Sequence, residues 1–109
     1  MTNKQKMNAL RILLDEFQSY LNEQEKKSYN NLNHKFAIPQ ISNSTYLLEF
    51  HKDRGDTIEK YQFLSFQDPM HAKHYIQALF NLMTINKSIY HESTMFEVMR
   101  LLTNNKAYL

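Results

Sequence analysis

Residues 45–66 of the chain, TYLLEFHKDRGDTIEKYQFLSF, consist of two runs rich in aromatic and branched residues with DRGD between them. Runs of this kind on either side of a glycine-containing turn predict a β-hairpin. Gly55 is the only glycine in the chain, and glycine adopts at low cost the positive φ that hairpin turns use. We therefore expect the rest of the chain to be organised around a hairpin that turns at Gly55.

The charges of the two runs predict how the strands align. With Lys52 opposite Thr57, Glu49 lies opposite Lys60 and opposite charges meet, whereas a shift by one residue places Glu49 against Glu59. The preferred register gathers five apolar side chains on one face: Tyr46, Leu48, Phe50, Tyr61 and Phe63. Because a two-stranded hairpin is marginal in water, this face needs a cover of helices.

An amphipathic helix is predicted before the hairpin. Thr2 and Gln5 have the spacing of a capping box. Apolar residues then recur at intervals of three and four, with two more widening the stripe: Met7, Leu10, Leu13, Leu14, Phe17, Tyr20 and Leu21. Since the heptad rhythm is shorter than a coiled coil requires, we expect the stripe to cover the hairpin, with a homodimer seam as the alternative.

The connector between helix and hairpin, residues 27–44, is polar and lacks periodicity. Within it, residues 35–41 are predicted as a short edge strand beside the hairpin, with Pro39 blunting the open edge. An alternative is that the first helix ends near Glu25 and a helical turn follows around 29–32.

A second helix follows the hairpin. Asp68 before Pro69 is an N-cap carboxylate followed by proline at the first helical position, and the helix should run to about Thr84. Its expected buried stripe comprises Ala72, Tyr75, Ile76, Leu79, Leu82 and Met83. A second capping box, Thr94 with Glu97, predicts a third helix.

The predicted fold class is therefore α+β, with a small antiparallel sheet centred on the hairpin (about 45–66) covered by an N-terminal helix and two C-terminal helices. A length of 109 residues and 42% hydrophobic residues favour one folded domain, 1–109. The absence of cysteine suits a reducing compartment. No apolar run reaches the length of a membrane span, so we expect a cytoplasmic protein without a membrane partner.

Catalytic apparatus is not evident in the sequence. A chain with one glycine cannot carry a dinucleotide fingerprint, and no serine lies in a nucleophile elbow. Asp15 and Glu16 are adjacent on the predicted helix and point in different directions, which suits an acid–base pair poorly. We expect no enzyme activity and no cofactor.

Histidines supply one weak alternative to that expectation. His71 and His74 are three residues apart and share a helix face, so they could bind a metal with Asp68 or His51. Two convincing ligands are too few, and we expect no metal site. His34 and His91 are expected at the surface.

By elimination, the sequence favours a small cytoplasmic regulator or inhibitor that binds another protein. Residues on a loop held by a rigid scaffold often bind partners, so the expected partner-binding residues are those of the hairpin tip: Lys52, Asp53, Arg54 and Asp56. A simpler interpretation is a solvated turn whose charges discourage edge pairing. Short chains that lack cysteine and are rich in lysine and asparagine are common on phages and other mobile elements of AT-rich bacteria, and this analogy of composition favours such an origin.

The alternative function is an accessory protein that binds DNA or RNA. A hairpin can enter a groove or hold single strands, and lysines from the first part of the chain would assist Lys52 and Arg54: Lys4, Lys6, Lys26, Lys27 and Lys35. The net charge of only +2 and the presence of Asp53 and Asp56 at the tip oppose this interpretation.

Overall fold

A computed structural model describes residues 1–27 and 33–85 of the chain. The helical turn proposed at 29–32, the third helix and His91 lie outside these residues. The described elements, in chain order, are α1 (Asn3–Lys27), β1 (Asn33–Ala37), β2 (Tyr46–Asp53), β3 (Ile58–Phe66) and α2 (Pro69–Ile85). This mixture of helices and a small sheet confirms the α+β class.

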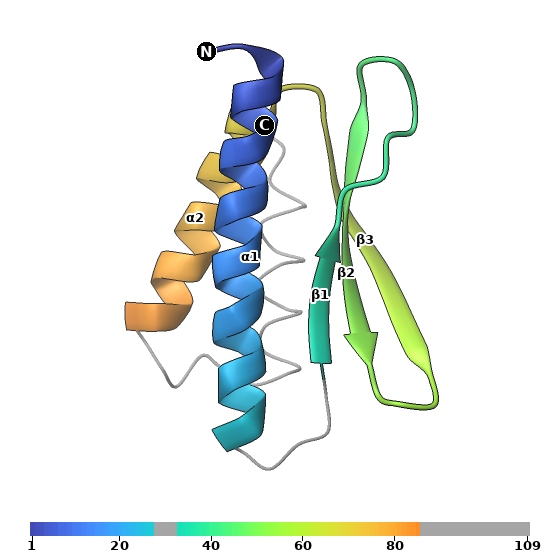
Figure 1. Ribbon diagram of the computed structural model, residues 1–109, viewed down its shortest axis with the longest axis vertical. Helices are drawn as coiled ribbons and strands as arrows, with labels where there is room; N and C mark the ends of the chain where they lie inside the picture. The colour runs from blue at the N-terminus through green and yellow to red at the C-terminus, as the bar shows by residue number, and fades with distance from the viewer. Residues whose placement is uncertain (28–32, 86–109) are drawn as a thin grey trace.

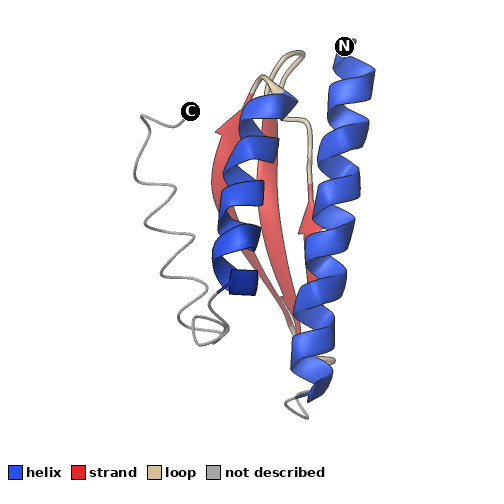
Figure 2. Cartoon of the chain, turned by 90° about the vertical axis from the view of Figure 1, so that its left-hand side faces the viewer, coloured by secondary structure: helices blue, strands red, loops and turns tan. Residues whose placement is uncertain are grey.

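The elements form two layers (Figures 1 and 2). The three strands make an antiparallel sheet in the order β1-β2-β3, and both helices lie on the same face of it. The core between the layers is mostly apolar, and Leu10, Phe17, Leu48, Phe50 and Leu79 are completely buried in it. Neither described helix is long and apolar enough to cross a membrane.

The first helix forms as its sequence predicts. Thr2 N donates to Gln5 Oε1 at 2.8 Å and Gln5 N donates to Thr2 Oγ1 at 3.1 Å, which is the reciprocal pair of a capping box. The predicted stripe faces the core, with five members buried: Leu10, Leu13, Leu14, Phe17 and Leu21. Met7 and Tyr20 pack at its margin.

An edge strand does lie beside the hairpin, but it spans Asn33–Ala37 instead of 35–41. Proline has no N–H to donate to a ladder, and the regular strand ends two residues before Pro39. The Pro39 carbonyl still accepts a hydrogen bond from Leu47 N at 2.9 Å. Ile41 is exposed because the chain is already turning there, with Ile41 N donating to Thr45 O at 2.9 Å.

The predicted hairpin register is wrong. Lys52 lies opposite Glu59 instead of Thr57. The reason is a tighter turn, in which Arg54 N donates to Thr57 O at 2.9 Å and leaves only Gly55 and Asp56 between them. Charge pairing could not distinguish the observed register from the predicted one, because each places a lysine opposite a glutamate.

A β-bulge separates the two halves of β3. Glu49 lies opposite Gln62 but Leu48 lies opposite Leu64, so Phe63 is an extra residue in the ladder. Consequently Tyr46 pairs with Phe66, and their rings stack at a centroid distance of 5.7 Å. Beyond the bulge, β3 contributes two buried residues to the core, Leu64 and Phe66.

The second helix begins at the predicted cap. Asp68 Oδ1 accepts a hydrogen bond from Met70 N at 3.0 Å. Within the described residues the helix runs to Ile85 and so covers the expected range to about Thr84. Its predicted stripe is buried except for Leu82, which is 44% exposed. Phe80 packs against α1, where its ring stacks on the ring of Phe17 at a centroid distance of 4.8 Å.

Candidate functional site

The hairpin tip is a well-bonded turn. Gly55 has a φ of +98°, a conformation that side chains other than glycine rarely adopt. Asp53 Oδ1 accepts a hydrogen bond from Gly55 N at 2.8 Å, which is an Asx-type closure of the turn. In Figure 1 the tip lies to one side of α1, at the opposite end of the sheet from the start of α2.

Arg54 and Tyr61 meet on a shared carboxylate. Arg54 Nε donates to Glu59 Oε1 at 2.8 Å, and the Tyr61 hydroxyl donates to Glu59 Oε2. The Arg54 side chain is 40% exposed and Tyr61 is 37% exposed. We call Arg54, Glu59 and Tyr61 the tip cluster. Each member is held in place by a neighbour while part of its surface faces solvent.

The tip cluster favours an ionised Glu59. The hydrogen bond from Tyr61 and then that from Arg54 lower the pKa of the Glu59 carboxyl below its ordinary value, and the positive charges of Arg54 and Lys52 act in the same direction. The carboxylate is therefore an acceptor for both donors at neutral pH. This arrangement orients the arginine and the tyrosine but provides no proton that is poised for acid–base chemistry.

Lys52 is placed differently from the other predicted tip residues. It is 5% exposed and lies on the helix-facing side of β2, with Nζ 5.6 Å from the centroid of the Tyr61 ring. Of the predicted partner-binding residues, Asp53 is half-buried, and Arg54 and Asp56 are exposed at the turn. Lys52 is therefore a buried neighbour of Tyr61 and not an exposed residue of the tip.

Glu59 and Tyr61 were not predicted as site residues. Their place in the site depends on the register, because Glu59 approaches Arg54 only when the loop is as short as Gly55-Asp56. The signal was present in the sequence, since a glycine followed by aspartate is a common two-residue hairpin loop.

The lysines of the nucleic-acid alternative lie in separate parts of the described structure, and Lys35 is on β1 opposite His51. Lys4 and Lys6 belong to the first turns of α1, and Lys26 and Lys27 to its last turn. A helix of 25 residues spans roughly 37 Å, which separates these two pairs. Lys6 is also 3.8 Å from Asp68 Oδ1.

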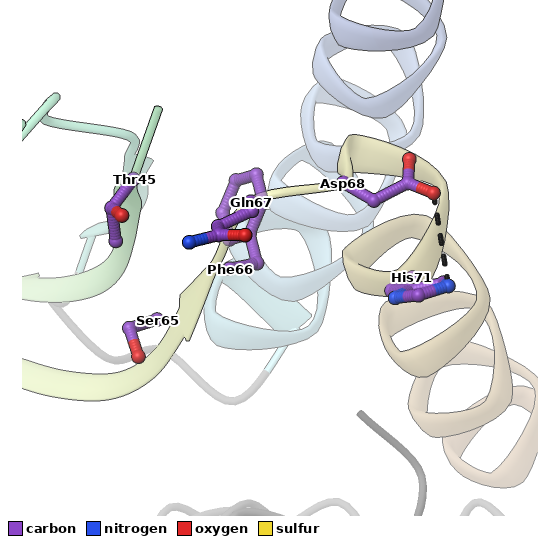
Figure 3. Close-up of a pocket in the computed structure, with 6 residues that line it drawn as sticks. All are labelled: Thr45, Ser65, Phe66, Gln67, Asp68 and His71. Carbon is purple, nitrogen blue, oxygen red and sulfur yellow. Dashed lines mark ion pairs between the residues drawn. The ribbon is translucent and has the colours of Figure 1, made fainter. Parts of the chain in front are cut away.

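A hollow lies at the start of α2 (Figure 3). It encloses about 390 Å³ and is lined by Thr45, Ser65, Phe66, Gln67, Asp68 and His71. His71 Nε2 is 3.7 Å from Asp68 Oδ2. The Met70 N–H, and then the charges of Lys6 and His71, lower the pKa of Asp68 below its ordinary value. Asp68 is thus engaged as a helix cap.

The structure brings no metal-ligand set together within residues 1–27 and 33–85. No group of three histidine or acidic side chains in this part of the chain could hold an ion. His51, proposed as a further ligand for His71 and His74, instead contacts Glu49, with Nε2 and Oε1 3.1 Å apart.

His34 is buried, so its predicted surface position is wrong. Its Nε2 lies 3.0 Å from Glu25 Oε1, and both side chains are almost inaccessible. The ring stacks on Phe50 at a centroid distance of 5.1 Å. This pair could not be predicted from local patterns, because it forms only when α1 and β1 fold back on each other.

No protein-family model, curated protein or solved structure matches the chain. The geometry of the described residues therefore carries the functional argument alone.

Proposed function

We propose that the protein is a small, non-enzymatic regulator or inhibitor that binds another protein through the hairpin tip. The observation that carries this proposal is the tip cluster, in which one carboxylate fixes an exposed arginine and an exposed tyrosine. Arginine and tyrosine are the residues that protein interfaces concentrate and that most often dominate binding energy.

Preorganisation strengthens this proposal. Binding becomes less favourable by about 0.5 to 1.5 kcal/mol for each long side chain that the interface has to immobilise. Arg54 is already oriented by Glu59, and the backbone beneath it is closed by the Gly55 and Thr57 hydrogen bonds. A partner that meets this surface has less ordering to impose than it would on a solvated loop.

The partner's acceptors would meet the arginine, and its apolar surface would meet the tyrosine ring. The absence of cysteine and the lysine-rich, asparagine-rich composition support a cytoplasmic site of action and a phage or mobile-element origin. We infer no cofactor for this activity.

The test begins with identification of the partner by affinity capture from the native host and continues by calorimetry with the purified partner. Arg54→Ala should weaken binding by about 1 kcal/mol or more, roughly fivefold in Kd, as interface arginines do. Tyr61→Phe removes only the hydroxyl and should weaken binding less than Tyr61→Ala. Arg11→Ala is the matched control, because Arg11 is an exposed arginine on α1.

Equal affinities for Arg54→Ala, Tyr61→Ala and wild type would remove the tip from the interface. Binding to random-sequence DNA that falls steeply with salt would replace the proposal with the nucleic-acid alternative. The melting temperature of each variant, measured in parallel, shows whether weaker binding comes from a lost contact with the partner or from a destabilised fold.

A further inference from the structure

Among the described strands, the outer side of β1 is a sheet edge, since their order is β1-β2-β3. In an antiparallel ladder, residues alternate between pointing their N–H and C=O groups toward the neighbouring strand and away from it. His34 and Phe36 point these groups away from β2, toward α1. Outward backbone groups on an edge strand are a template for pairing with another chain.

Side chains of α1 form hydrogen bonds with three of these outward groups. Asn22 Oδ1 accepts a hydrogen bond from His34 N at 2.7 Å, and Asn22 Nδ2 donates to His34 O at 3.2 Å. Gln18 Oε1 accepts from Phe36 N at 3.1 Å. Gln18 and Asn22 are four residues apart, so both lie on one face of α1. A side-chain amide carries one carbonyl acceptor and an N–H donor, as a peptide group does, and Asn22 uses both on one residue.

We infer that Gln18 and Asn22 act in place of a fourth strand and close the β1 edge against a second copy of the chain. The edge groups permit self-pairing, because an antiparallel β1 pair centred on Lys35 sets His34 of each copy opposite Phe36 of the other, although it also sets the two Lys35 residues opposite each other, which weakens such a pair. The outward N–H and C=O of His34 and the outward N–H of Phe36 are the groups to which α1 now bonds. A backbone group that is bonded to an α1 amide cannot also bond to a second strand, so pairing requires that the Gln18 and Asn22 amides be removed.

Removal of the amides leaves other contacts between α1 and the sheet in place. In the structure, Glu25 Oε1 and His34 Nε2 are 3.0 Å apart and Phe17 packs against the Phe36 ring at a centroid distance of 5.4 Å, and neither contact involves the two amides. The edge bonds can therefore be tested in a protein that retains its core.

Amide hydrogen exchange tests the assignment residue by residue. Asn22→Ala should speed exchange of the His34 amide at least about fivefold, the effect expected of one lost hydrogen bond, and leave Phe36 unchanged. Gln18→Ala should do the reverse. Asn8→Ala, an exposed asparagine on the same helix, is the control and should change neither. A uniform rise at all strand amides in the single variants would assign the two amides to general stability and overturn the inference.

Self-association tests the consequence. The double variant Gln18→Ala/Asn22→Ala should form dimers in sedimentation experiments as its concentration rises, while the wild type and Asn8→Ala do not. If the double variant fails to fold, the same measurement on each single variant decides. Folded variants with the association behaviour of the wild type at every concentration would show that the amides do not guard the edge.

Discussion

Replacement of Glu25 by alanine tests the least expected feature of the core. The change removes the acceptor 3.0 Å from His34 Nε2, where the two side chains are 3% and 0% exposed. An unsatisfied buried polar group costs about 1 to 3 kcal/mol, and the lost γ-methylene adds about 0.8 kcal/mol. We expect Glu25→Ala to lower the free energy of unfolding by about 2 to 4 kcal/mol, a large share of the stability of a small domain.

Two further variants show whether the hydrogen bond or the charge matters. Glu25→Gln keeps an oxygen acceptor and should cost less than half as much as Glu25→Ala. The double change Glu25→Leu with His34→Phe replaces the pair by apolar side chains, and such replacements are often neutral or stabilising. We expect it to lie within about 1 kcal/mol of the wild type, whereas His34→Phe alone should be worse.

Urea denaturation followed by far-ultraviolet circular dichroism measures these differences, provided that the slope with denaturant stays constant. A loss below about 1 kcal/mol for Glu25→Ala would refute the reasoning, because the pair would then contribute no more than a surface contact. Equal losses for the alanine and glutamine variants would refute the assignment to the hydrogen bond.

Three other outcomes are expected. Leu79→Ala should cost about 2 to 5 kcal/mol in urea denaturation, since Leu79 is completely buried, and a loss below about 1 kcal/mol would contradict its place in the core. Gly55→Val should lower the melting temperature because valine at a φ of +98° is strained, although a Cβ there meets no atom within 4 Å; an unchanged temperature would argue against this turn. Asp68→Asn keeps the cap but removes the charge. Because the pKa of Asp68 lies below its ordinary 3.8 in the folded chain, the wild type should be the more stable above that pH and lose the advantage as pH falls through the lowered pKa. An advantage independent of pH in denaturation series would contradict this.

Local signals predicted most of the fold. The capping box at Thr2, the cap at Asp68 and the helical periodicity each depend on residues a few positions apart, and the helices begin where these signals place them. The edge strand was also recognisable, although its bounds were not, because Pro39 still takes part in pairing through its carbonyl.

The features that sequence reasoning missed depend on tertiary structure. A bulge at Phe63 has no glycine or other local mark, so the Tyr46 and Phe66 pair could not be anticipated. Burial of His34 depends on the last turns of α1 meeting β1. The tip cluster required the correct register, and only Arg54 of its three members was predicted as a site residue.

The bulge divides β3 into two parts whose side chains lie in different surroundings. On its far side Leu64 and Phe66 fill the core, and on its near side Glu59 and Tyr61 belong to the tip. The extra residue shifts the alternation of the strand, so the residues on the helix-facing side are Glu59 and Tyr61 before the bulge and Leu64 and Phe66 after it. Sequence changes confined to the residues before the bulge would therefore leave the two core residues that follow it, Leu64 and Phe66, in place.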